Sequence, residues 1–458
     1  MVIDIGKLRQ GTQEQITDTK AVQSAIDRCA ESGGGDVVFS AGEYVLATVF
    51  LKSNVHIILE DGAVVFGTEK FDEYMPDEKV DYPLYQDASH SFFHCSMFVG
   101  IDCENISIVG KGTIDMRSVW DEQNVRAMYY RGAKTIALKN CRHVEIADIT
   151  VLNSTDLALY FAGCENVNVC GVKMCVHIDG ISPDNSKRVT IKNCDIECGD
   201  DGIVFKSSYT LNRLDICEDI VVENCRVKSR CNAVKFGTET NGGFRNILIE
   251  NIQIYETRIS GIAIESVDGA VIDGVTIKNV RMRNVNAPIF IHLGKRMRGP
   301  KGLEIGKIRN VLLENITAEG PYEAYEIIPH NYAAYTRGDN FQEPWRFWKK
   351  DIARKDGAWQ MTSNVCGLEG HPLENLTFRN VSLILDGRVQ EYESEVPEVA
   401  QDYPEVYVYG RILPAKGIFF RYIDGLNLEN VSVKTYHRDV RQDFVFKDVV
   451  GLARKNRR

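Results

Sequence analysis

The amino-acid sequence predicts an all-β protein, a parallel β-helix, because one short apolar pattern recurs along it without any helical period. In each copy, apolar residues stand at positions i, i+2, i+5 and i+7. The copies begin at Val144, Val167, Val189, Ile220, Ile247, Val275, Val311, Leu376 and Leu426. A coil of such a solenoid buries its apolar face only by stacking on the next coil, so we expect a single β-helix domain over residues 1–458.

Each pair of apolar residues two positions apart predicts a short strand with one face turned inward. The shift from i+2 to i+5 marks a bend, which is occupied by Asn193, Asn224, Asn251 and Asn279. Asparagine tolerates left-handed backbone and bonds its own chain, so it suits a sharp bend between strands. A leucine-rich repeat is excluded because leucine does not dominate the pattern and no helix accompanies each copy.

The N-terminal region predicts a helix over residues 18–32 that covers the open end of the solenoid. Asp18 or Thr19 can cap it, and Gly33-Gly34-Gly35 ends it. Its apolar side consists of Ala21, Val22, Ala25, Ile26 and Cys29. In the C-terminal half, two long gaps between copies predict loop insertions over residues 319–371 and 386–424, both rich in aromatic residues.

Composition excludes several classes of protein. The 458 residues carry 54 Lys and Arg against 64 Asp and Glu, a net charge of −10, which argues against a nucleic-acid partner. No apolar run is long enough to span a membrane, and no export signal precedes the first repeat. The 13 cysteines form no CxxC pair and indicate a reducing compartment, so we expect a cytoplasmic protein. No sequence motif indicates a metal or another cofactor.

Acidic side chains recur at one position of successive coils. Five residues after the last apolar residue of four consecutive copies stand Asp156, Asp179, Asp201 and Asn232. Equivalent positions of neighbouring strands lie about 4.8 Å apart, so we expect Asp179 and Asp201 to be neighbours across one coil spacing. Asp200 stands beside Asp201 between two glycines, which permit a bend that turns both acids toward one cleft.

Three crowded carboxylates match the needs of glycoside hydrolysis. One protonated acid donates to the leaving oxygen, and another carboxylate activates water. Because like charges resist ionising together, crowding itself raises one pKa toward neutrality. A lone Asp-Gly pair is more often a surface turn, but Asp179, Asp200 and Asp201 in matched register favour catalysis.

The segments Asp179-Gly180-Ile181-Ser182-Pro183-Asp184, Gly199-Asp200-Asp201-Gly202-Ile203 and Lys206-Ser207 resemble the central signature of glycoside hydrolase family 28, the polygalacturonase and rhamnogalacturonase group. The resemblance extends roughly from Asp18 to Met282. It implies a right-handed β-helix and hydrolysis with inversion. It also implies that Asp200 is the general acid and that Asp179 and Asp201 hold the attacking water.

The sequence departs from that signature at three places. His177-Ile178 replaces Asn-Thr before Asp179, and Cys231-Asn232-Ala233 replaces Gly-His-Gly. Where polygalacturonases bind a uronate carboxylate with Arg-Ile-Lys, this chain has Ala263 and Glu265. A methyl group and a carboxylate cannot bind an anion, so we expect a neutral sugar such as rhamnose or galactose unless Lys206, Lys235 or a loop arginine supplies the charge.

Further side chains are candidates for substrate binding because they adjoin the acidic positions or carry flat apolar faces that stack on sugar rings. They are His177, Lys206, Asn232, Lys235, Glu265, Trp345 and Trp348. The long aromatic insertion would close the cleft and favour exo action on short oligosaccharides.

The sequence thus predicts an inverting glycosidase whose partner is an oligosaccharide, and it leaves the oligomeric state open. Two alternatives remain. A polysaccharide lyase on the same scaffold needs a Lys or Arg base near a uronate, often with calcium, and no calcium-binding loop is present. A non-catalytic carbohydrate-binding solenoid would keep the coils and the aromatic residues but has no use for three crowded acids.

Overall fold

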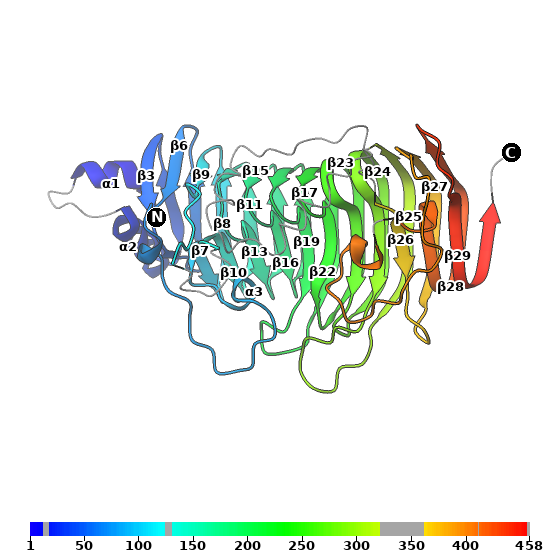
Figure 1. The fold of residues 1–458 in the computed structure, drawn as a ribbon. Coiled ribbons are helices and arrows are strands. Elements are labelled where there is room, and N and C mark those ends of the chain that lie inside the picture. The colour runs from blue at the N-terminus through cyan, green and yellow to red at the C-terminus, as the bar shows by residue number, and fades with distance from the viewer. Residues whose placement is uncertain (12–17, 124–130, 321–360, 411, 456–458) are drawn as a thin grey trace. The chain divides into compact units, whose positions relative to one another are not determined.

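The computed structural model describes residues 1–11, 18–123, 131–320, 361–410 and 412–455. The chain divides into two compact units. Unit 1 comprises residues 1–226 and 241–248, and unit 2 comprises residues 227–240 and 249–458. Each unit is wound as a right-handed parallel β-helix (Figure 1). The single domain that the repeat predicts stays a prediction.

Unit 1 begins with the helices α1 (Ile5–Gly11) and α2 (Asp18–Glu31). The helix α2 confirms the predicted capping helix, and its buried residues are the five of the predicted apolar side. Asp18 and Thr19 lie within the helix, where their side chains accept hydrogen bonds from Val45 N at 2.8 Å and Ala47 N at 2.9 Å. They therefore tie the helix to the first coil. The helix α1 has no counterpart in the sequence-based prediction.

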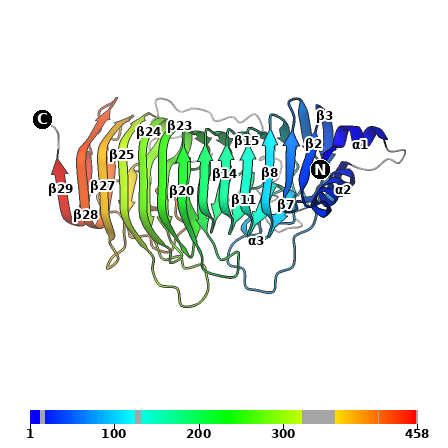
Figure 2. The same ribbon diagram turned by 180° about the vertical axis from the view of Figure 1, so that it is seen from behind.

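Parallel strands of unit 1 form three ladders, with one strand from each ladder in a typical coil. Figure 2 shows part of the first ladder, in which β8, β11 and β14 lie side by side. The first ladder contains β1 (Val2–Asp4), β2 (Gly35–Phe39), β5 (Val55–Leu59), β8 (Glu104–Gly110), β11 (Arg142–Ala147), β14 (Glu165–Cys170), β17 (Lys187–Lys192) and β20 (Ile216–Glu223). The second contains β3 (Gly42–Leu46), β6 (Ala63–Gly67), β9 (Thr113–Asp115), β12 (Thr150–Leu152), β15 (Lys173–Val176) and β18 (Asp195–Cys198). The third contains β4 (Val49–Phe50), β7 (Ser96–Ile101), β10 (Lys134–Lys139), β13 (Leu159–Ala162), β16 (Ile181–Asp184) and β19 (Ile203–Ser207).

The apolar repeat is the register of the first ladder. Val144 pairs with Val167, Val167 with Val189, and Val189 with Ile220, and all four are buried. The predicted bend residues have left-handed backbone, with φ between 55° at Asn193 and 59° at Asn251. Between the ladders, unit 1 also contains η1 (Phe71–Glu73) and α3 (Ala88–Ser91).

Unit 2 is built from longer strands that run through the bends. Its elements are β22 (Val234–Thr240), β24 (Val271–Leu293), β25 (Lys307–Glu319), β26 (Ser363–Cys366), β27 (Leu373–Leu385), η2 (Val406–Tyr409), β28 (Ala415–Thr435) and β29 (Gln442–Lys455). β21 (Arg226–Ser229) and β23 (Gly243–Ser266) contain residues of both units. The later copies of the repeat again pair in register, as Val311 does with Leu376 and Leu376 with Leu426.

Strands occupy part of each of the two predicted insertion ranges. β26 lies inside the predicted range 319–371 and pairs with β24 and β28, so residues 363–366 belong to the solenoid. β28 begins at Ala415, so residues 415–424 of the predicted range 386–424 belong to a strand. Counting gaps between copies of the repeat placed residues 363–366 in an insertion because β26 is short and lacks the apolar repeat.

None of the 13 cysteines forms a disulfide, and all except Cys170 and Cys175 are buried. They behave as small apolar side chains. Among the described residues, no helix has the length and apolar character needed to cross a membrane.

Candidate active site

The three predicted catalytic acids lie in two stacked turns of unit 1. Asp179 lies between β15 and β16, while Asp200 and Asp201 lie between β18 and β19. Gly180 N donates to Asp201 O at 2.9 Å, and Asp201 N donates to the Asp179 carboxylate at 3.2 Å. The predicted pairing of Asp179 with Asp201 across one coil spacing is therefore confirmed.

Glycines make the close stacking of these turns possible. A Cβ atom on Gly180 would lie 2.5 Å from Gly202 O, and one on Gly199 would lie 2.1 Å from His177 O. A side chain at either position would force the turns apart. Glycine is therefore needed at both positions for the two turns to bring the acids together.

Asp156 does not occupy the register position that the sequence predicts for it. Ala158 N donates to Asp179 O and Leu159 N to Gly180 O, both at 3.0 Å, which aligns Leu157 with Asp179. Asp156 is one residue out of step because the turn before β13 is one residue longer than counting from the repeat assumes. A shift of one residue changes the direction of a side chain, and Asp156 is fully buried.

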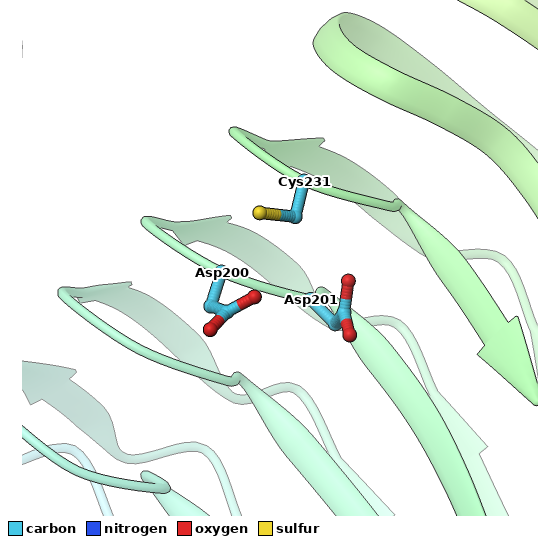
Figure 3. A group of neighbouring side chains, drawn as sticks. All are labelled: Asp200, Asp201 and Cys231. Carbon is cyan, nitrogen blue, oxygen red and sulfur yellow. The ribbon is translucent and has the colours of Figure 1, made fainter. Parts of the chain in front are cut away.

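The predicted catalytic acids differ in exposure. The Asp179 side chain is 6% exposed and that of Asp200 is 22% exposed. Figure 3 shows Asp200 and Asp201 leaving the same turn, with both carboxylates projecting from it. Asp200 is thus more accessible to a ligand than Asp179.

Burial and crowding keep one proton on this group near neutral pH. Burial is the largest cause that raises the pKa of Asp179, and the charge of Asp200 raises it further, to about 7. The ammonium of Lys206, 3.8 Å from the Asp179 carboxylate, acts in the opposite direction. A carboxyl group with a pKa near 7 suits acid–base chemistry at neutral pH. Lys206 was predicted to bind substrate, and in the structure it lies beside Asp179, one of the predicted catalytic acids.

Arg131 and Lys134 complete a buried charge network that sequence reasoning missed. Arg131 Nη2 lies 3.6 Å from Asp200 Oδ2, and Arg131 Nη1 lies 3.9 Å from Asp156 Oδ1. Lys134 Nζ lies 3.6 Å from Asp156 Oδ2 and donates to Phe92 O at 3.0 Å. Arg131 stands shortly before β10, and no motif surrounds it in the sequence, so only the fold brings it to the acids.

His177, two residues before Asp179, faces the loop that follows β9. Its Nε2 and Ser118 Oγ lie 2.8 Å apart, and its ring centroid lies 5.3 Å from that of Trp120. These contacts hold the imidazole beside the turn that carries Asp179. Neither Ser118 nor Trp120 was identified from the sequence.

The predicted binding residues Asn232, Lys235 and Glu265 lie in unit 2 and form a buried cluster with a residue that the sequence did not indicate. Lys235 Nζ donates to Glu405 Oε1 at 2.8 Å, and Asn232 Nδ2 donates to Glu405 Oε2 at 3.2 Å. Glu265, fully buried, lies 3.8 Å from Lys235. Glu405 is 173 residues from Asn232 in the sequence, so no local pattern could have revealed it.

Trp345 and Trp348 lie outside the described residues, and their role in binding stays a prediction. The absence of a metal ion likewise stays a prediction. Asp200, Asp201 and Cys231 lie close enough together to hold one metal ion (Figure 3), but Arg131, 3.6 Å from Asp200, already places a cation beside these groups.

Comparisons with known proteins identify the family of this chain. The family model described as glycosyl hydrolases family 28 matches residues 47–328, which is more than half of the chain. A probable polygalacturonase of Vitis vinifera is 24% identical over 281 residues, covering 58% of this chain and 56% of that protein. An exo-poly-alpha-D-galacturonosidase of Dickeya chrysanthemi is 25% identical over 288 residues, covering 51% of this chain and 47% of that protein. The chain thus spans about half the length of the curated relatives it matches.

Solved structures show the same fold at low sequence identity. The family 28 exopolygalacturonase of Yersinia enterocolitica has a TM-score of 0.67 and 18% identity, with 98% of this chain and 78% of that chain covered. The exopolygalacturonase of Thermotoga maritima has a TM-score of 0.64 and 15% identity, with coverages of 95% and 92%. The matched family model includes both turns that carry Asp179, Asp200 and Asp201. This chain belongs to the glycosyl hydrolases family 28.

Proposed function

We propose that this chain is an inverting, exo-acting glycoside hydrolase whose substrate is a neutral-sugar or pectin-related oligosaccharide. The observation that carries the proposal is the group of three carboxylates in unit 1, one of which has a pKa near 7 while another is exposed enough to meet a substrate.

In this proposal Asp200 is the general acid, as the family resemblance implies. Its exposed carboxyl group donates a proton to the leaving oxygen, while Asp179 and Asp201 orient the attacking water and accept its proton. Because burial and the charge of Asp200 raise the pKa of Asp179 to about 7, one proton is available within the group near neutral pH. When a sugar covers Asp200 and excludes water from it, the neutral form of the Asp200 carboxyl group is favoured, just as burial favours the neutral form of Asp179.

The charges of the unit 2 cluster support a neutral sugar. Lys235 already contacts Glu405 at 2.8 Å and Glu265 at 3.8 Å, so two carboxylates neutralise its charge. Ala263 and Glu265 occupy the positions at which the family signature has cations. In unit 1, Lys206 is paired with Asp179. Both lysines that could rescue uronate binding are therefore engaged by carboxylates within the described residues, and an incoming carboxylate would meet net negative charge at the cluster of Lys235, Glu265 and Glu405.

The exo mode and the cytoplasmic location are parts of the same proposal. One relative of the chain is named an exo-poly-alpha-D-galacturonosidase. Free thiols in this number are typical of proteins in a reducing compartment such as the cytoplasm. Short oligosaccharides rather than polymers are available there, which suits an exo-acting enzyme.

The test is a panel of aryl glycosides and pectin-derived oligosaccharides incubated with the wild type, Asp200→Asn and Asp195→Asn. Asp195 is the matched control because its carboxylate lies on the surface beside Arg226. We expect the wild type and the control to release neutral sugars from chain ends, and Asp200→Asn to lose at least about a thousandfold in kcat while still binding. Fast cleavage of polygalacturonate would contradict the substrate class. Unsaturated products would indicate a lyase, and binding without turnover by the wild type would indicate a binding protein.

A further inference from the structure

Asp156 is a buried carboxylate of unit 1 that the proposed mechanism does not use. Its side chain is fully buried, and so is that of Lys134, whose Nζ lies 3.6 Å from Asp156 Oδ2. Leu157 N donates to Asp156 Oδ1 at 2.8 Å, and Ser89 Oγ donates to the same oxygen at 2.5 Å. Lysine and aspartate are seldom fully buried, because taking two charges out of water often costs more than their ion pair returns. Exceptions to this rule are expected at functional sites, so Asp156 is a candidate for a role in the reaction.

The guanidinium of Arg131 lies between Asp156 and Asp200. Arg131 Nη1 is 3.9 Å from Asp156 Oδ1, and Arg131 Nη2 is 3.6 Å from Asp200 Oδ2. Arg131 Nη1 also donates a hydrogen bond to Ser89 Oγ at 3.3 Å. Because Ser89 in turn donates to Asp156, its hydroxyl ties the guanidinium to the buried carboxylate. The distance of 3.6 Å to Asp200 is longer than a hydrogen bond, so Arg131 acts on Asp200 through its charge.

The short helix that carries Ser89 is fixed against the third ladder. The helix α3 begins after Asp87, whose side chain accepts a hydrogen bond from His90 N at 3.3 Å. Tyr160 OH, on β13, donates to His90 O at 2.9 Å. Ser89 itself is fully buried. The packing of α3 on β13 therefore sets the position of the Ser89 hydroxyl.

The charges of this group determine how Asp200 is affected. Asp156 has one negative charge against the two positive charges of Arg131 and Lys134, so the three side chains together present a single positive charge to Asp200. Without the charge of Asp156 they would present two. Nearby positive charge favours the ionised form of a carboxyl group, whereas a general acid must hold its proton. Asp156 therefore helps Asp200 to stay protonated.

Other titratable groups also face Arg131 and Asp200. Burial acts to lower the pKa of Arg131, but four surrounding carboxylates raise it, those of Asp87, Asp156, Asp200 and Asp179. The Asp87 side chain is 38% exposed and lies 2.6 Å from His90 Nδ1, so water and His90 weaken its effect. The titratable groups near Asp200, apart from Arg131, are Asp179 with its neighbour Lys206, Asp201 and Cys231. All of them remain in the variants described below, so a difference between those variants reports on Asp156 and Arg131.

We propose that Asp156 is a positioning residue, which holds Arg131 back from Asp200 and thereby keeps Asp200 able to carry the proton that the reaction needs. The inference rests on the proposed hydrolase function and adds to it a side chain that does not touch the substrate. Ser89 ties Arg131 to Asp156, and Lys134 is the counterion that lets Asp156 stay ionised in the interior.

The test measures the pH profile of kcat/KM for an aryl glycoside of rhamnose or galactose, whichever the wild type cleaves. Asp156→Asn keeps an oxygen that can accept from Leu157 N but removes the charge. The basic limb of the profile, where the general acid loses its proton, should therefore move downward by about one pH unit. Ser89→Ala is a milder change, which tests the same link if Asp156→Asn does not fold, and it should move the limb downward by about half a pH unit.

Asp184→Asn is the matched control. This carboxylate is also fully buried, but it accepts hydrogen bonds from Ser208 N and Tyr160 OH, both at 2.9 Å, and its substitution should leave both limbs in place.

A second comparison tests whether Asp156 acts through Arg131. In the Arg131→Met background, Asp156→Asn should shift the profile by less than half as much, because the guanidinium that Asp156 holds is gone. A profile that Asp156→Asn leaves in place or moves upward would overturn the inference, even if the variant is less stable, because Asp156 would then have a purely structural role. An equal shift in both backgrounds would also overturn it.

Carboxyl NMR gives a measure that needs no substrate. In protein with isotope-labelled aspartate carboxyl groups, the signal of Asp200 is the one that Asp200→Asn lacks. The midpoint of its titration should fall by about one pH unit in Asp156→Asn, and an unchanged or higher midpoint would overturn the inference. A wild type that cleaves no glycoside would instead refute the hydrolase function, so the two failures are distinguishable.

Discussion

Replacing Asp179 with asparagine tests the electrostatics of the site through the free energy of unfolding. The substitution keeps the shape of the side chain and its capacity to accept from Asp201 N. The ordinary pKa of an aspartate is 3.8, and burial with Asp200 nearby raises that of Asp179 to about 7. A raised pKa means that the folded state binds the proton more tightly than the unfolded state. The ionised carboxylate therefore destabilises the fold as the pH rises from about 4 to about 7.

The magnitude follows from the two pKa values. Linkage gives a cost of about 2 kcal/mol at pH 5 and about 4 kcal/mol at pH 8.5, so the wild type should lose roughly 2 to 3 kcal/mol relative to Asp179→Asn between these values. Urea denaturation at several pH values measures the difference. The double variant Asp179→Asn/Lys206→Met is the control for Lys206, which loses its partner in the single variant. A difference in unfolding free energy that does not change with pH would refute the reasoning.

Two further substitutions test the charges around the acids and in unit 2. Glu405→Gln removes one of the two carboxylates that neutralise Lys235, so calorimetry should show roughly tenfold tighter binding of galacturonate, and unchanged or weaker binding would contradict the proposed basis of specificity. Arg131→Met removes a cation that lowers the pKa of Asp179, so both limbs of the pH profile of kcat/KM should move upward by about one pH unit. A profile that stays in place or moves downward would show that Arg131 does not act on the acids.

The sequence predicted the solenoid and the stacking of Asp179 beside Asp201 because both depend on local periodicity. The repeat that begins at Val144 indicates which side chains face the core. Its spacing predicts that Asp179 lies beside Asp201, as the structure shows. The glycines around the acids mark a close approach of two turns, which is also a local property. Asp156 was misplaced because a single extra residue in a turn shifts the register without disturbing the apolar pattern.

Other parts of the site depend on contacts between distant segments and leave no local pattern. Glu405 reaches Lys235 from a position 170 residues away, and Arg131 lies in a segment with no repeat. Trp120 and Ser118 were missed because a single aromatic residue and a single hydroxyl in a loop carry no spacing. Such residues can be identified only when the coils are assembled in three dimensions.

The configuration of the newly released sugar tests the central claim most directly. Proton NMR recorded during the first minutes of hydrolysis distinguishes the anomers before they equilibrate. If Asp200 protonates the leaving oxygen while Asp179 and Asp201 direct water to the opposite face, the first product has the inverted anomeric configuration and Asp200→Asn releases none of it. Retained configuration, or an undiminished rate in Asp200→Asn, would contradict this account.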